Sequence, residues 1–175
     1  MKKKPGVKII SGRKNFAIDF RKKQSKIAQA IGNYEIHHIG STAIPGLGGK
    51  GIIDVMIALN SWAEEKTIIK NLKSLGFNHV HPKENGRIFM SKKAETKAGD
   101  IHIHLVKKGS RVYKELIAFR NYLRKHKKET QRYFTLKLEL IERTKSNRAE
   151  YTAGKKEYLK KLTQKAIEYE DSFRH

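Results

Sequence analysis

The sequence predicts an α/β fold (α+β in the broader sense), in which a mixed β-sheet with flanking helices precedes a C-terminal helical bundle. Three observations favour this class: a nearly continuous apolar run at residues 52–59, an alternating polar and apolar segment at residues 101–105, and a helical period in the apolar side chains from residue 110 onward. The chain has no internal repeat and no long linker. Residues 15–175 should therefore form a single domain behind a basic leader of residues 1–14.

The α/β core, expected at residues 15–108, should begin with a helix at residues 15–31, because apolar side chains recur there on one face of a 3.6-residue period. These side chains are Phe16, Phe20, Ile27 and Ile31. A short strand is expected at residues 34–39. The glycine-rich stretch 40–51 predicts a loop with one helical turn at its start. The apolar run that follows should be a strand buried on both faces.

Asn60 or Ser61 should cap the next helix, which is expected to end near residue 75. Two strands of a hairpin should follow at residues 77–80 and 87–91, around a polar turn. The alternation at residues 101–105 places both histidines of that strand on one face and its isoleucines on the other.

The C-terminal part, residues 109–175, is expected to contain three helices, at about residues 110–126, 128–143 and 147–170. Each helix carries an apolar stripe that should pack against a common core. The stripes are Val112, Leu116, Phe119 and Leu123, then Tyr133, Leu136, Leu140 and Ile141, then Tyr151, Tyr158, Leu162, Ala166 and Tyr169.

The composition limits both the chemistry and the location. The chain has no cysteine, which excludes disulfides, zinc–thiolate sites and thiol catalysis. No apolar run approaches the roughly 18 residues that a membrane span needs. The basic start of the chain has no apolar stretch behind it, so we do not expect a secretory signal there. We expect a cytoplasmic protein that does not bind a membrane.

The charge is strongly positive, with 39 Lys and Arg against 17 Asp and Glu and a formal net charge of +22. Such a field attracts polyanions, including RNA and nucleotides. The alternative is a solvated basic surface, because the aromatic residues are not interleaved with the lysines as in a platform for single-stranded nucleic acid. Both interpretations stay open at this point.

A group of residues around Gly40–Ser41 and Asp54 could carry chemistry. A Gly–Ser pair at the end of a strand, opening a helical turn, offers backbone N–H groups and a hydroxyl to a phosphate, and Thr42 continues that turn. Asp54 lies within an otherwise apolar strand, where a charge is costly to bury without a partner. The partner is either a metal ion or cation at a functional cleft, or a structural lysine or arginine.

The same stretch resembles the signature of the GrpB family. The residues that carry the resemblance are His37–Leu47 (HHIGSTAIPGL), then Lys50 and Ile52–Asp54, and further along Arg87 and Phe89, His102 and His104, Phe119–Arg120 with Tyr122–Arg124, and Tyr151 with Lys155. It covers nearly the whole chain from about residue 15. Gly51 departs from the proline that the family usually has after the lysine. GrpB domains also occur fused to dephospho-CoA kinases.

The resemblance implies the fold of the nucleotidyltransferase superfamily. Active members hold two Mg²⁺ ions with a D-x-D pair that follows the G-S pair, and a third acidic residue comes from a later strand. Asp54 matches the first acid, and Ser41 and Asp54 would be the catalytic residues. Met56 stands in place of the second acid, and Asp100 lies only at the entrance of the later strand. Ordinary two-metal nucleotidyl transfer is therefore in doubt.

Two alternatives remain for the metal chemistry. Asp54, His102 and His104 could form a facial site for one divalent transition metal. The other interpretation is that the two histidines hydrogen-bond to Asp54 and to loop carbonyls without any metal.

Four cations match motif positions of the family and could clamp phosphates from several sides: Lys50, Arg87, Arg120 and Lys155. Lys155 lies on an apolar stripe, between Tyr151 and Tyr158, where a lysine either extends outward or binds an anion. The leading hypothesis is a protein that binds a nucleotide or another phosphorylated small molecule through Gly40, Ser41, Thr42 and these cations. A non-catalytic module that binds RNA or protein and a metal-dependent hydrolase are the alternatives.

Overall fold

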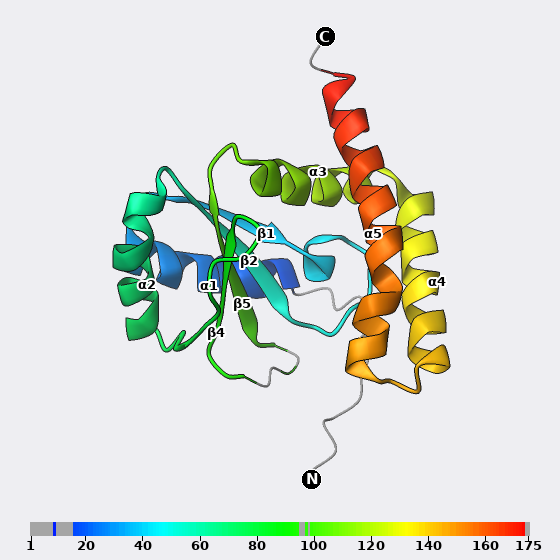
Figure 1. Ribbon diagram of the computed structural model, residues 1–175, viewed down its shortest axis with the longest axis horizontal. Helices are drawn as coiled ribbons and strands as arrows, with labels where there is room; N and C mark the ends of the chain where they lie inside the picture. The colour runs from blue at the N-terminus through cyan, green and yellow to red at the C-terminus, as the bar shows by residue number, and fades with distance from the viewer. Residues whose placement is uncertain (1–8, 10–15, 95–96, 98, 174–175) are drawn as a thin grey trace.

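The computed structural model describes residue 9 and residues 16–94, 97 and 99–173. Apart from residue 9, the basic leader expected at residues 1–14 lies outside the described residues. The expected α/β class is confirmed: five strands form one mixed sheet, and helices cover both of its faces and one end (Figure 1).

The sheet has the strand order β1-β2-β5-β4-β3. Its strands are β1 (Glu35–Ile39), β2 (Ile53–Leu59), β3 (His79–Val80), β4 (Arg87–Ser91) and β5 (Ile101–Lys107). The two central strands, β2 and β5, run parallel, and the other neighbours are antiparallel. In the parallel register Asp54 lies beside His102, and Met56 lies beside His104. This register brings two segments almost fifty residues apart together at one end of the sheet.

Two helices cover one face of the sheet, α1 (Phe16–Ile31) and α2 (Glu65–Ser74). The stripe expected on α1 is buried there with the apolar side chains of the central strands. A short 3₁₀ turn, η2 (Trp62–Glu64), leads into α2, and Ser61 caps it in a capping box with Glu64. The expected helix after residue 60 therefore begins with a 3₁₀ turn.

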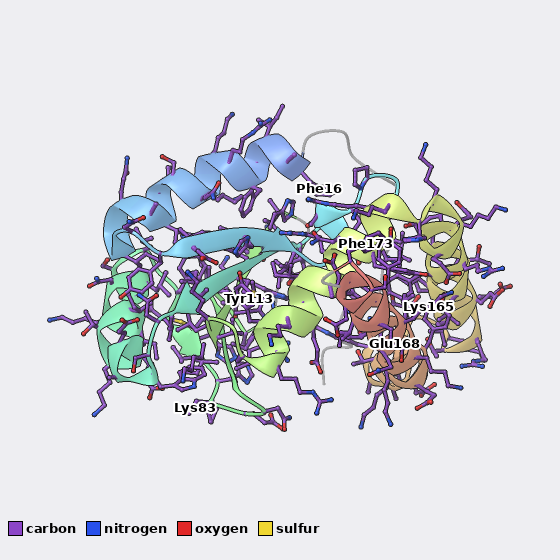
Figure 2. The ribbon with its side chains drawn as sticks, turned by 90° about the horizontal axis from the view of Figure 1, so that it is seen from above. Phe16, Lys83, Tyr113, Lys165, Glu168 and Phe173 are labelled. Carbon is purple, nitrogen blue, oxygen red and sulfur yellow. The ribbon has the colours of Figure 1, made fainter. Side chains whose placement is uncertain are left out.

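The opposite face is covered by α3 (Arg111–Lys125), and α4 (Lys127–Arg143) and α5 (Arg148–Asp171) pack beside it at one end of the sheet (Figures 1 and 2). Under α3, a small apolar cluster contains Ile39, Met56 and Val106. The three C-terminal helices share a core of their own with Ile44 and Leu47 of the glycine-rich loop. None of the helices among the described residues is long and apolar enough to cross a membrane.

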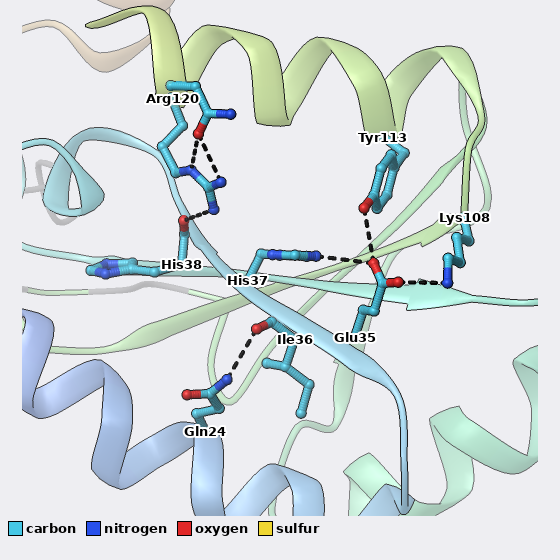
Figure 3. A network of polar contacts seen from close by, with 9 residues as sticks. Gln24, Glu35, Ile36, His37, His38, Lys108, Tyr113 and Arg120 are labelled. Atoms are coloured by element: carbon cyan, nitrogen blue, oxygen red, sulfur yellow. Dashed lines mark hydrogen bonds and ion pairs between the residues drawn. The ribbon is translucent and has the colours of Figure 1, made fainter. Parts of the chain in front are cut away.

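The outer strand β1 is tied to α3 and to the end of β5 by a polar network (Figure 3). Glu35 accepts hydrogen bonds from the Tyr113 hydroxyl at 2.9 Å and lies 2.6 Å from the Lys108 ammonium. Lys108, Tyr113 and His37 together lower the pKa of Glu35 to about 2. Arg120 donates to the backbone carbonyl of His38 at 3.2 Å. These contacts fix the strand that leads into the glycine-rich loop.

The helices α4 and α5 approach each other closely at Gly154. A Cβ atom at this position would lie 2.5 Å from a methyl carbon of Leu140, so only glycine fits without displacing that side chain. This close contact holds α5 against α4 and fixes where the side chains of both helices point toward the sheet.

Candidate functional site

A cavity of about 230 Å³ lies where one end of the sheet meets α4 and α5. Three parts of the chain line it: the glycine-rich loop, the first residues of β2 and β5, and the two C-terminal helices. Its lining residues are Ser41, Thr42, Gly49, Lys50, Ile52, Asp54, His102, Tyr133, Lys137, Tyr151 and Lys155. The cavity is therefore built from the glycine-rich loop, from the starts of β2 and β5, and from the helices α4 and α5.

On the sheet side, Asp54 is held by two histidines. The Nδ1 atom of His102 lies 3.3 Å and the Nε2 atom of His104 lies 3.2 Å from the same carboxylate oxygen, Oδ1. Burial alone would raise the pKa of Asp54, but the hydrogen bonds from His102 and His104 outweigh it and lower the pKa below its ordinary value. Asp54 is thus an ionised carboxylate with a quarter of its side-chain surface exposed.

His104 contacts Asp54 through Nε2, and its other ring nitrogen is enclosed. Its Nδ1 atom is buried and has no hydrogen-bond partner among the described residues. A proton on that nitrogen would be a buried, unsatisfied donor, which is costly. The proton is therefore on Nε2, which donates it to Asp54, and the ring packs edge-on against Phe89 at a centroid distance of 5.5 Å.

The glycine-rich loop depends on glycine where it passes over Asp54. Gly40 has φ 70° and ψ −171°, a conformation that is essentially restricted to glycine. A Cβ atom there would lie 2.3 Å from Oδ2 of Asp54. Gly49 similarly faces Ser41, with 2.9 Å between the position of an added Cβ and the serine Cβ. The backbone thus closes over the carboxylate and the serine together.

The Thr42 side chain is held in place by hydrogen bonds to β1 and to the end of the glycine-rich loop. Its hydroxyl donates to the carbonyl of Ile52 at 3.0 Å and accepts from Nε2 of His38 at 3.0 Å. His38 is stacked on Phe20 of α1 at 4.6 Å, and burial, with the charge of Arg124, lowers its pKa to about 4. His38 therefore stays neutral and holds the loop from beneath; it does not face the cavity.

On the helical side, the main feature is a buried lysine. Lys137 is 2% exposed, and its ammonium donates to the Ser41 hydroxyl at 3.3 Å and to the backbone carbonyl of Gly48. The same ammonium lies 4.7 Å from the centre of the Tyr133 ring. Burial, with a smaller effect of Lys155, lowers the pKa of Lys137 to about 7. Its partners are all neutral groups.

Two further lysines share one aromatic ring. The ammonium groups of Lys155 and Lys50 lie 4.3 Å and 5.2 Å from the centre of the Tyr151 ring. Burial and the charge of Lys50 lower the pKa of Lys155 to about 8, although Asp54 opposes this effect. Burial also lowers the pKa of Lys50. None of the salt bridges between described residues involves either of these lysines or Lys137.

The charges of the cavity are consequently unbalanced. Of its described lining residues, Asp54 alone carries a carboxylate, while Lys50, Lys137 and Lys155 carry ammonium groups. Each ammonium sits against neutral oxygens or an aromatic ring. The arrangement favours a ligand with several negative charges.

The structure brings most of the sequence-predicted residues together, but it separates two of them from the rest. Ser41, Thr42, Lys50, Asp54, His102 and Lys155 line the cavity, with Gly40 and His104 directly behind Asp54.

Arg87 and Arg120 do not line the cavity. Arg87 is exposed and pairs with Val106, four residues along β5 from His102, which is roughly 13 Å away at the rise of a strand. Arg120 is bound to the carbonyl of His38 and to Asn121, so its role is to support β1. The expectation that these two arginines clamp a phosphate with Lys50 and Lys155 is corrected on these grounds.

Sequence reasoning missed Lys137, Tyr133 and Tyr151 as parts of the site. The signal for Lys137 was present: it lies four residues after Tyr133 and three before Leu140, on the buried stripe of α4. The same pattern had marked Lys155 on α5. A lysine on an apolar stripe is a candidate anion ligand wherever it occurs.

The carboxylate and histidines of this site do not fit a metal ion well. Within the part of the chain that the structure describes, no group of three or more His, Asp or Glu side chains could hold a metal ion. A metal-bound imidazole usually donates its other N–H to a partner, whereas Nδ1 of His104 has none among the described residues. The divalent ion expected at Asp54, His102 and His104 stays a prediction that this donor set does not favour.

Comparison with known proteins identifies relatives along most of the chain. A family model described as GrpB protein matches residues 6–165. The glutamate-rich protein GrpB of Alkalihalophilus pseudofirmus is 29% identical over 162 residues, 88% of this chain and 92% of that protein. The UPF0157 protein YqkA of Bacillus subtilis is 30% identical over 166 residues, 91% of this chain but 47% of YqkA. The chain therefore spans about half the length of YqkA.

Solved structures agree on the fold. The crystal structure of the conserved protein GrpB from Enterococcus faecalis superposes with a TM-score of 0.82 at 22% identity, covering 93% of this chain and 98% of that one. Cid1, described as having RNA terminal uridylyl transferase activity, gives a TM-score of 0.51 at 14% identity, over 74% of this chain and 40% of Cid1. At these identities the likeness concerns the fold alone, which is nucleotidyltransferase-like.

Proposed function

The chain belongs to the GrpB family, and we propose that its cavity binds the phosphate groups of a nucleotide or of another phosphorylated small molecule. The observation that carries the proposal is the convergence of Lys50, Lys137 and Lys155 on a cavity with a single carboxylate among its described lining residues. Lysines that are not neutralised by carboxylates are binding groups for an anion, and phosphate is the common biological anion with enough charge for three of them.

Lys137 is buried, which makes it a stronger candidate for anion binding than a surface lysine. Desolvating an ammonium group is costly unless it gains an opposite charge or strong hydrogen bonds. Lys137 has two neutral oxygen partners and one aromatic ring in the absence of ligand. A phosphate oxygen at this place would supply the missing negative charge, so the protein keeps an unfavourable lysine that becomes favourable when the anion binds.

The glycine-rich loop supports the same function. The Ser41 hydroxyl accepts from Lys137, so its own proton is free to be donated to a ligand oxygen in the cavity. Thr42 is fixed by His38, which keeps the turn in place without a ligand. The loop and the lysines are therefore already arranged around the place where the anion would bind, and little ordering is needed on binding.

Nucleotidyl transfer by two metal ions is not included in this function, although the fold is nucleotidyltransferase-like. That reaction needs carboxylates on alternate positions of one strand. Asp54 is present, but the position two residues later is Met56, which is fully buried under α3. The geometry supports binding of the phosphate groups, and the described residues that line the cavity include no second carboxylate for the metals.

Ligand-induced stabilisation tests the proposal. Wild-type protein should show a rise in melting temperature with nucleoside di- and triphosphates or inorganic pyrophosphate, since a ligand that binds only the folded state stabilises it. Lys137→Met should weaken binding by about tenfold or more, because a charge-assisted contact is lost. Lys156→Met, an exposed position on α5, is the control and should bind as wild type does. Absence of a shift with every phosphorylated compound would contradict the proposal.

A second candidate function, RNA binding, is favoured by a basic surface at the junction of α3 and α4. A hollow of about 480 Å³ there is lined by Tyr122, Lys125, His126, Lys127, Lys128, Glu129, Arg132 and Lys165. Phe173, 69% exposed, lies close to Lys125. Cations next to aromatic rings are typical of sites for single-stranded nucleic acid. A titration of a single-stranded RNA at several salt concentrations checks this: a steep loss of affinity with salt supports it, and no measurable binding at low salt rules it out.

A further inference from the structure

The places where a nucleotidyltransferase-like fold would hold metal ions are occupied by other groups in this chain. Met56, on the same face of β2 as Asp54, is fully buried and packs against Ile39 and Val106 under α3. The residue beside it on β5 is His104, which is itself bound to Asp54. Among the described residues that line the cavity, a single carboxylate is left to meet a cation.

Both oxygens of that carboxylate lie against protein groups, although a quarter of the side-chain surface stays exposed to the cavity. Oδ1 lies 3.2–3.3 Å from the ring nitrogens of two histidines, His102 and His104. Oδ2 lies so close to Gly40 that a Cβ atom there would be 2.3 Å away. Because His104 needs its Nε2 proton for Asp54, that nitrogen has no lone pair for a metal ion. Asp54 consequently joins β2, β5 and the loop.

Three ammonium groups line the cavity that Asp54 faces. Lys137 comes from α4, Lys155 from α5 and Lys50 from the loop, and all three line the same cavity. They are near enough to lower one another's pKa: Lys155 does so for Lys137, and Lys50 for Lys155. A divalent cation entering the ligand-free cavity would be repelled by these charges. An anion with several charges would be attracted by each of them.

The size of the cavity limits what it can enclose. Its volume of about 230 Å³ is below the range of about 300–1,000 Å³ that is usual for drug-sized ligands. The rings of Tyr133 and Tyr151 already face lysine ammonium groups and are not open platforms for stacking a base. A phosphate chain fits these walls, with any nucleoside lying outside.

We propose that the cavity binds a short phosphate chain, free or as the end of a nucleotide, through Lys50, Lys137 and Lys155 and without a divalent metal ion. The lysines neutralise the charge that Mg²⁺ neutralises in metal-dependent members of this fold. This inference rests on the proposed function and adds to it the ligand group and the source of the positive charge.

Calorimetric titration with sodium tripolyphosphate, ATP and adenosine, each in excess EDTA and in excess MgCl₂, tests the metal requirement. Tripolyphosphate and ATP should bind in EDTA at least as tightly as with Mg²⁺, because the free chain carries more negative charge, and adenosine should not bind. Affinity that is about tenfold or more higher with Mg²⁺ than in EDTA would overturn the metal-free mode. Binding of adenosine would overturn the choice of the phosphate chain as the bound group.

Two substitutions with opposite expected effects on affinity distinguish metal-free binding from metal-dependent binding. In EDTA, Asp54→Asn should tighten tripolyphosphate binding by about two- to fivefold, since a negative charge beside the anion is removed, and Lys137→Met should weaken it by about tenfold or more. Loss of binding in Asp54→Asn with the fold intact by circular dichroism would contradict the proposal. If Lys137→Met does not fold, Lys155→Met replaces it, with exposed Lys156→Met as control. Failure of every probe in both buffers would refute the proposed function itself; binding that needs Mg²⁺ and Asp54 would refute only the metal-free mode.

Discussion

Replacing the buried lysine by an apolar residue of similar length should make the ligand-free protein more stable. In Lys137→Met the side chain keeps its length and its packing between α4 and the loop, but the ammonium group is removed. Proteins often keep an unfavourable group at a functional site and lose stability for it. If Lys137 is kept because it binds an anion, its replacement should raise the free energy of unfolding of the ligand-free protein.

The magnitude follows from the burial of the charge. The pKa of Lys137 falls from 10.5 to about 7 in the folded protein, and a shift of this size corresponds to a cost of roughly 5 kcal/mol for the charged form. The variant also leaves the buried carbonyl of Gly48 without a donor, at about 1–3 kcal/mol, whereas the half-buried Ser41 hydroxyl lines the cavity and keeps access to water. We therefore expect a net increase in the free energy of unfolding of about 2–4 kcal/mol near neutral pH.

The pH dependence gives an independent check of the same charge. Between about pH 7 and pH 10.5 the unfolded chain holds the Lys137 proton and the folded protein does not, so the wild type gains stability as pH rises through this window. The penalty is complete below about pH 7 and absent above pH 10.5. The advantage of Lys137→Met should therefore shrink with rising pH, by up to about 1.4 kcal/mol per pH unit.

Urea unfolding at pH values from 6 to 10, followed by circular dichroism, measures both effects, because this range covers most of the window between the folded and unfolded pKa values of Lys137. Lys128→Met, exposed on α4, serves as the control and should change stability by less than about 0.5 kcal/mol. A Lys137→Met protein that is less stable than wild type at neutral pH, or whose difference from wild type does not vary with pH, would refute the interpretation of Lys137 as a buried, uncompensated charge.

Three further predictions concern residues that hold the cavity in shape. Gly40→Ala should lower the free energy of unfolding by about 3 kcal/mol in urea melts, since its backbone conformation excludes a side chain and the new Cβ would overlap Asp54. Gly46→Ala is the control: Gly46 also has a positive φ, but no atom lies within 4 Å of the new Cβ, so this variant should lose only about 1 kcal/mol. Gly154→Val should cost about 1–3 kcal/mol by the same assay, because any Cβ there meets a leucine of α4 at 2.5 Å; an unchanged midpoint would mean that α4 and α5 are not packed as described. Glu35→Gln should flatten the loss of melting temperature as pH falls from 4.5 toward 2, because the lowered pKa of Glu35 stabilises the fold only while it is ionised; equal acid profiles of variant and wild type would contradict this.

Most helices and strands could be predicted because their signals are local. The capping box at Ser61 and the side-chain cap at Ser110 mark the starts of two helical segments. The alternation at residues 101–105 correctly placed both histidines on one face of β5. The strand order could not be predicted, because it depends on pairing between segments far apart in the sequence, such as Asp54 beside His102.

Residues that come from one continuous motif could be predicted to lie together. The prediction failed for residues whose place depends on how distant segments of the chain pair. Ser41, Thr42, Lys50 and Asp54 come from one stretch of chain and line one cavity. Arg87 matched a family position, but the antiparallel pairing of β4 with β5 carries it to the far end of the sheet. Lys137 was overlooked among 39 basic residues, although its place on an apolar stripe distinguishes it from the exposed ones.

A crystal structure of the protein with tripolyphosphate, grown in EDTA, tests the central claim most directly. We expect phosphate oxygens within about 3 Å of the Lys137 ammonium, with Lys50 and Lys155 on the other side of the chain and no metal ion at Asp54. An anion bound away from Lys137, for instance at the basic junction of α3 and α4, would contradict the account.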